Sequence, residues 1–84
     1  MQGGGMKKKV VGRHLVTDPK VCHGQPTFRG TRILVADVLE QVANGMAWGS
    51  IVAEWRGSIS EDAIAEAVRA ARETFREHAR ELAV

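Results

Sequence analysis

Apolar side chains recur at helical spacing from residue 35 onward in this 84-residue chain. The first group falls at i, i+3, i+4 and i+7 and consists of Val35, Val38, Leu39 and Val42. Polar residues take the opposite positions, so the pattern predicts an amphipathic helix of about two and a half turns that begins at Val35. Asn44-Gly45 ends this helix, because glycine suits the left-handed position after a last helical turn.

A short second helix is predicted over 47–55, where Ile51, Val52 and Trp55 share one face. Its start is weakly signalled. Ala47 offers no oxygen to cap the first turn, and Gly49 lowers helix propensity by up to about 1 kcal/mol relative to alanine. We therefore expect this helix to be less rigid than a well-capped one.

The third helix has the clearest start signal. Ser60 fits the N-cap position, and Glu61 and Asp62 occupy the first turn, where the helix dipole favours negative charge. Ile59 and Ile64 stand at the two positions of a hydrophobic staple. These signals predict a helix that begins directly after Ser60.

A seam of side chains at intervals of 4, 3, 4, 3 and 4 runs along this helix: Ile64, Val68, Ala71, Phe75, His78 and Leu82. The first half of the seam can bury against the first two helices. The distal half can bury against another chain, so Phe75, His78 and Leu82 are the predicted dimer or partner interface. A chain this short and this poor in aromatic residues favours helical packing completed by a second subunit.

The segment before the helices is predicted to be extended. Residues 1–12 are expected to form a flexible basic arm in front of a single domain over 13–84. The run 10–19 fits one extended segment closed by a turn at Asp18-Pro19. Residues 32–35 fit either a second short strand or the run-in to the first helix.

The predicted fold class is mainly α. It is a three-helix, helix-turn-helix-like domain preceded by a short extended or β segment, and we expect it to be dimeric.

Charge is distributed unevenly along the chain. Residues 1–34 have seven basic side chains and one acidic one, a net +6, whereas residues 35–84 have five arginines and nine carboxylates, a net −4. The basic half is therefore predicted to meet an anion, either nucleic acid or an acidic protein surface. The predicted contact residues are Lys7, Lys8, Lys9, Arg13, Arg29 and Arg32.

The third helix fits DNA contact less well. Its first turns contain Glu61, Asp62 and Glu66, which would repel the phosphate backbone. DNA bound by this chain is therefore expected to meet the N-terminal half.

Four arginines at helical spacing form a second basic feature: Arg69, Arg72, Arg76 and Arg80. Three of them follow a glutamate by three residues, an arrangement worth about 0.2–0.5 kcal/mol per pair on an exposed helix. The expected pairs are Glu66 with Arg69, Glu73 with Arg76, and Glu77 with Arg80. We favour a self-paired, solvated face over a docking surface.

The loop that precedes the first helix is predicted to bend twice. Gly24 and Pro26 shape one bend, and Gly30 supplies a second where a side chain would clash. A turn at Gly30-Thr31 can bring together two cations that would face opposite ways in a straight strand, Arg29 and Arg32.

Arg29 and Arg32 have two open interpretations. They contact a partner, or they serve the fold, for example with Arg32 pairing to a carboxylate such as Asp37. Replacing both with alanine separates the two, since only a structural role predicts a large fall in melting temperature.

Catalysis and metal binding have little support. The histidine and cysteine residues, which most often act as catalytic base, nucleophile or soft metal ligand, are His14, Cys22, His23 and His78. Cys22 and His23 are adjacent, which is not zinc-site spacing, and neighbours in an extended chain point to opposite faces. No phosphate-loop motif is present. We expect no catalytic residue, metal, cofactor or small-molecule substrate.

No stretch reaches the roughly 18 apolar residues of a membrane helix, and the glycine- and lysine-rich start lacks the apolar centre of a signal peptide. The single cysteine excludes an internal disulfide. We expect a cytoplasmic protein that neither spans nor binds a membrane.

The run GQPTFRGTRILV, residues 24–35, resembles the G-x-P-x-x-x-G-T-R-I-x-V core of the small bacterial domain-of-unknown-function family 433. The helices that follow extend the resemblance over about 13–79. It implies a helix-turn-helix-like fold, usually dimeric, and an antitoxin role in toxin-antitoxin pairs. The implied partners are a PIN-like ribonuclease toxin, whose site is a cluster of metal-binding carboxylates, and operator DNA.

Two departures from the family pattern affect this interpretation. The short second helix usually opens with a Ser or Thr cap and paired acids and ends in aromatic-proline, whereas Ala47, Gly49 and Trp55-Arg56 stand here. Many antitoxins also bind their toxins through a long C-terminal tail, whereas the third predicted helix here runs almost to Val84, the last residue of the sequence. The toxin-binding element is therefore expected on the folded surface, at the end of the third helix or in the N-terminal arm. The alternatives are a stand-alone DNA-binding transcriptional regulator and a structural protein-interaction module.

Overall fold

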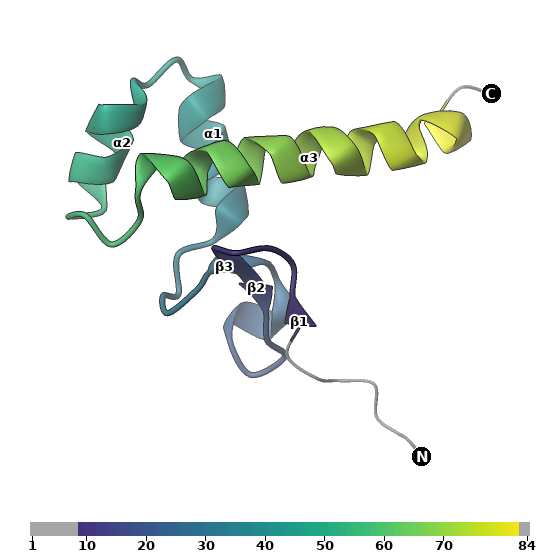
Figure 1. Cartoon of the computed structure of the whole chain (residues 1–84), viewed down its shortest axis with the longest axis horizontal. Coiled ribbons are helices and arrows are strands. Elements are labelled where there is room, and N and C mark those ends of the chain that lie inside the picture. Colours follow the sequence, from purple (N-terminus) through teal and green to yellow (C-terminus); the bar gives the residue numbers. More distant parts are fainter. Residues whose placement is uncertain (1–8, 83–84) are drawn as a thin grey trace.

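The computed structural model describes residues 9–82, with the side chains of 11–79 and of Glu81. It is a mainly α fold of three helices preceded by a small sheet (Figure 1). The elements in chain order are β1 (Lys9–Val10), β2 (Leu15–Thr17), the short 3-10 helix η1 (Cys22–Gly24), β3 (Thr27–Phe28), α1 (Val35–Ala43), α2 (Trp48–Glu54) and α3 (Glu61–Leu82).

The N-terminal strands form an antiparallel sheet in the order β1-β2-β3. Val10 pairs with Val16, and Leu15 pairs with Phe28. The chain reverses between β1 and β2, where the N–H groups of Val11 and Gly12 both donate to the carbonyl of Leu15. The prediction of one extended segment over 10–19 is therefore wrong, because a hairpin turn divides it.

The sheet also changes the predicted N-terminal boundary. Lys9 and Val10 belong to the segment predicted as a flexible arm, yet they form β1. Residues 1–8 of that arm, with Lys7 and Lys8, lie outside the described residues.

Residues 32–35 are the run-in to the first helix. Leu34 makes one isolated bridge with Thr27, and the N–H of Val35, the first residue of α1, donates to the carbonyl of Pro26 at 3.0 Å. The strand that precedes α1 is instead β3, at Thr27–Phe28, and it lies before residues 32–35.

Helices α1 and α2 end in the same way. After α1, the N–H of Gly45 donates to the carbonyl of Val42 and the next N–H reaches back to Gln41. This hydrogen-bond pair defines a Schellman motif, and Gly45 has the left-handed φ of +81° that the motif requires. The predicted end of the first helix is confirmed.

The end of α2 repeats the motif with an unusual residue. The N–H of Arg56 donates to the carbonyl of Ala53, and that of Gly57 donates to Val52. Arg56 therefore occupies the left-handed position that Gly45 fills after α1, with φ +55°. The indole N–H of Trp55 also donates to Gln41 Oε1 at 2.7 Å, which ties the end of α2 to α1.

Helix α3 begins as predicted. The N–H of Ala63 donates to Ser60 Oγ at 3.1 Å, so Ser60 caps the helix. Ile59 and Ile64, the two staple residues, are both buried.

The core lies between the sheet, α1, α2 and the first half of α3. Its buried residues are Leu15, Phe28, Val35, Val38, Ile51, Ile59, Ala63, Ile64 and Ala67. Beyond this core α3 continues past the other helices (Figure 1), and its side chains from Ala71 to His78 are exposed. None of the helices described between residues 9 and 82 has the length and apolar content needed to cross a membrane.

Candidate functional site

The described basic residues of the N-terminal half lie on the surface. Arg13, Arg29 and Arg32 are all exposed. Lys9 lies in β1, but its side chain falls outside the described part of the structure. We therefore build the candidate site on the three arginines.

A tight turn presents two of these arginines. The N–H and the hydroxyl of Thr31 both donate to the carbonyl of Phe28, at 3.0 and 2.8 Å, and the hydroxyl oxygen accepts from the N–H of Ile33. Gly30 has φ +78°, as the turn requires. A Cβ on Gly30 would meet nothing within 4 Å, so the backbone angle, and not the predicted clash, explains this glycine.

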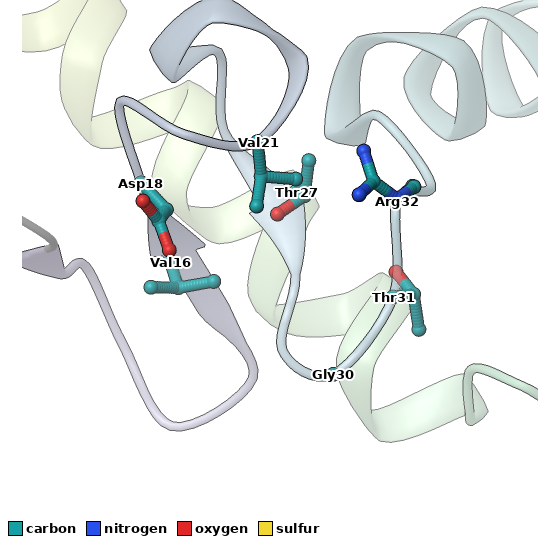
Figure 2. Close-up of a pocket in the computed structure, with 7 residues that line it drawn as sticks. All are labelled: Val16, Asp18, Val21, Thr27, Gly30, Thr31 and Arg32. Atoms are coloured by element: carbon teal, nitrogen blue, oxygen red, sulfur yellow. The ribbon is translucent and has the colours of Figure 1, made fainter.

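The turn distributes Arg29 and Arg32 over two hollows, whereas we expected it to bring them together. Arg32 lines a hollow of about 340 Å³. Figure 2 shows Asp18 on one side of this hollow and Arg32 on the other, with Val21 and Thr27 between them. A carboxylate and a guanidinium thus share one surface. Among the described side chains Arg32 has no ion pair, with Asp37 or with any other carboxylate.

Arg29 lines a second hollow, of about 280 Å³, between the hairpin turn and the start of α3. We call it the Arg29 hollow. The described residues around it are Arg13, His14, Phe28, Arg29, Gly57, Ser58, Ile59, Ser60 and Ala63. They include two arginines, one histidine and two serines, and no aspartate or glutamate. The Arg29 hollow is therefore chemically suited to an oxyanion.

Glu66 of α3 closes the hairpin turn beside this hollow. Its carboxylate accepts the N–H of Arg13 at 2.7 Å and the N–H of His14 at 2.8 Å. Gly12 permits this approach, because a Cβ at that position would overlap the carboxylate of Glu66. Two charge-assisted hydrogen bonds thus join residues 52 and 53 positions apart.

The sequence interpretation missed this role of Glu66. We expected it to pair with Arg69 on its own helix and to repel phosphates. The one local feature of the sequence that fits this contact is Gly12, which precedes Arg13 and His14. A glycine does not identify the acceptor of their hydrogen bonds.

Two of the predicted ion pairs along α3, Glu66 with Arg69 and Glu73 with Arg76, do not form, and the side chain of Arg80 lies outside the described residues. The observed pairs are Arg72 with the neighbouring Glu73 at 3.0 Å, and His78 with Glu81 at 3.2 Å. Both are exposed, and pairs of this kind contribute about 0–1 kcal/mol. Among the described side chains, Arg69 and Arg76 therefore have no ion pair.

The distal half of the predicted seam forms an uncovered face on α3. Phe75 is 65% exposed, and Ala71 and His78 are exposed as well. Leu82 is the last residue of α3, and its side chain lies outside the described residues. We call Ala71, Phe75 and His78 the distal α3 face.

The loop ahead of β3 differs from the extended chain that we assumed. Cys22 and His23 both have positive φ, +50° and +58°, within η1. The thiol of Cys22 lies 3.5 Å from the carbonyl of Arg32. Gly24 has φ +81°, so its predicted place in a bend is confirmed. Within residues 9–82 no group of three potential ligands is placed to hold a metal ion.

Comparison with known proteins gives one match. A family model described as "Protein of unknown function (DUF433)" matches residues 15–70. No curated protein and no solved structure matches the chain. The matched segment runs from β2 to the part of α3 that packs on the core, so it includes the loop with Arg29 and Arg32.

Proposed function

The chain belongs to the DUF433 family, and we propose that it has the role that its sequence resemblance implies. In this role it is an antitoxin-like protein that binds and neutralises a PIN-like ribonuclease toxin and also binds operator DNA. The distal α3 face is the surface for the toxin, and the basic N-terminal half is the surface for DNA.

The observation that supports a protein partner is the exposure of Phe75. An aromatic side chain that is 65% exposed stands on a helix that extends beyond its own core. Burying a phenylalanine fully contributes about 1.5–3 kcal/mol, and exposed apolar helix faces commonly dock in the grooves of partner proteins. The distal α3 face thus offers a partner binding energy that the monomer does not use.

Charge beside Phe75 fits an acidic partner. Arg72 and Arg76 flank it on the helix and are exposed. The ion pair of Arg72 with Glu73 is at the surface, so a carboxylate of the partner can replace Glu73 at little cost. A PIN-like ribonuclease, whose site is a cluster of carboxylates, has the complementary chemistry.

Co-expression with the product of the adjacent gene tests the proposal. We expect the two proteins to co-purify and the ribonuclease activity of the partner to fall. Phe75→Ser should weaken the complex at least tenfold. Val11→Ser removes a comparably exposed apolar residue, 52% exposed, from the hairpin and should leave the complex intact. Absence of a complex with the unmodified protein would reject the toxin-binding part of the proposal.

A stand-alone transcriptional regulator is the second candidate. The observation that favours it is the Arg29 hollow, which has cations and no carboxylate among its described residues. The two candidates differ in what they need. A regulator binds its own promoter without a second protein, whereas the antitoxin requires a toxin encoded beside it.

A further inference from the structure

We propose that the Arg29 hollow is a phosphate-binding site that holds one phosphodiester group of the DNA backbone. The inference rests on the DNA-binding part of the proposed function and does not depend on the toxin. It assigns the contact to Arg29 and Arg13, with the hydroxyl of Ser58 as a further donor.

The charge inside the hollow carries the argument. Two exposed arginines, Arg13 and Arg29, line one hollow of about 280 Å³. Guanidinium groups bind phosphate oxygens through paired, charge-assisted hydrogen bonds. Ser58 adds a neutral donor from the loop before α3. The hollow therefore offers an oxyanion both charge and directed hydrogen bonds.

Both guanidinium groups have donors to spare. Arg29 uses one nitrogen, Nη2, to donate to the carbonyl of Gly12 at 3.3 Å, which positions the side chain along the hairpin turn. Its other N–H groups remain for a ligand. Arg13 contacts Glu66 through its backbone N–H. Its guanidinium makes no hydrogen bond within the described part of the chain.

The three carboxylates at the start of α3 do not line the hollow, although their sequence positions led us to expect repulsion. Glu66 is held by the N–H groups of Arg13 and His14. Asp62 and Glu66 line the adjoining hollow, together with Arg13, His14 and Arg69. The carboxylate of Glu61 lies toward Gly49 of α2, 3.7 Å from where a Cβ would stand. None of the three carboxylates therefore lines the Arg29 hollow, although Glu66 and Asp62 border it on the side of Arg13.

The hollow beside Arg32 does not meet the same requirement. Asp18 lines it opposite Arg32, so a phosphate there would meet a carboxylate as well as a cation (Figure 2). Of the two hollows, only the Arg29 hollow is therefore suited to binding an anion.

The test is DNA binding by the full chain, alone and in complex with its partner, at several salt concentrations. Two duplexes of equal length serve as ligands, one from the promoter of its own gene and one with a scrambled sequence. Arg29→Gln should weaken binding to both about 5- to 10-fold at low salt. It should also lower the slope of log K against log[salt] by about one unit, as expected for the loss of one phosphate contact. Arg13→Gln should act in the same direction, and it removes no hydrogen bond of the described structure.

Lys20→Gln is the matched control. It removes one positive charge from an exposed residue of the same half, and Lys20 lines none of the described hollows. The slope should stay unchanged in this variant. An equal loss for Lys20→Gln would show that only net charge matters, and would overturn the proposal.

Two other outcomes would also overturn it. One is the lack of measurable DNA binding by both the chain and its complex. The other is a loss of toxin binding in Arg29→Gln with DNA binding unaltered, which would assign the hollow to a protein carboxylate. Co-purification with the toxin is measured separately, so the antitoxin role can fail or stand independently.

Discussion

Glu66 is the residue of α3 that binds the hairpin turn between β1 and β2. It is half-buried, and its carboxylate accepts two backbone N–H groups that the turn leaves without strand partners. Hydrogen bonds to charged groups contribute about 1.5–3 kcal/mol, and solvent near Arg13 reduces that value here. One side chain thus holds the turn in place against α3.

Glu66→Ala should lower the free energy of unfolding by about 2 kcal/mol, because two N–H groups lose their charged acceptor. Urea unfolding followed by circular dichroism measures this change. Glu73→Ala, at an exposed position of the same helix, is the control and should stay within about 0.5 kcal/mol of the unmodified protein. Equal effects of the two variants would contradict the role given to Glu66.

Gly12 and Glu66 should be energetically coupled. In the unmodified protein Gly12→Ala displaces the carboxylate of Glu66 from its two donors, so we expect a loss of about 2 kcal/mol. Gly12 is not among the glycines with a positive φ. In a Glu66→Ala background the same change should therefore be neutral or stabilising by up to about 1 kcal/mol. A double-mutant cycle by urea unfolding measures the coupling, and additive effects would show that the two positions are independent.

At the scale of elements, the two Schellman motifs form an internal comparison. Gly45 and Arg56 take the same left-handed position after α1 and α2, but only glycine takes it without strain from a Cβ. Because Arg56 is exposed and makes no hydrogen bond with its side chain among the described residues, its backbone angle dominates the effect of replacing it.

Arg56→Gly should therefore stabilise the protein by about 0.5–1 kcal/mol, and Gly45→Ala should destabilise it by about 1 kcal/mol. Nothing lies within 4 Å of a Cβ at Gly45, so the loss there reflects the backbone angle alone. Thermal unfolding of both variants checks the opposite signs. A destabilised Arg56→Gly variant would mean that the arginine makes contacts worth more than its strain.

The helices were predictable because their signals are local. Periodicity, the Ser60 cap and the Gly45 stop each act within a few residues, and the observed helix ends agree with them closely. The hairpin turn was not predictable, since its charged acceptor lies more than fifty positions away. The arginines of the candidate site were identified from charge alone. Their separation into two hollows depends on the tertiary fold, which no local pattern specifies.

At the scale of the whole molecule, the exposed distal α3 face predicts self-association or binding to a partner. A substitution in this face should cost the monomer little stability. Phe75→Ser should change the free energy of unfolding by less than about 0.5 kcal/mol, because the side chain is mostly exposed. If the free protein forms the dimer expected from its sequence through this face, the same variant should shift it to monomer in sedimentation equilibrium. A dimer of unaltered affinity would place the interface elsewhere.

The far end of α3 has a consequence for how long the protein survives in a cell. From Ala71 to His78 the helix is supported by its own backbone hydrogen bonds and hardly by packing, so we expect it to open locally far more often than the core. Proteases cut where a helix opens, and a bound partner would close that site. Turnover of the free chain should then exceed turnover of the complex, so that the supply of partner sets the amount of protein that persists.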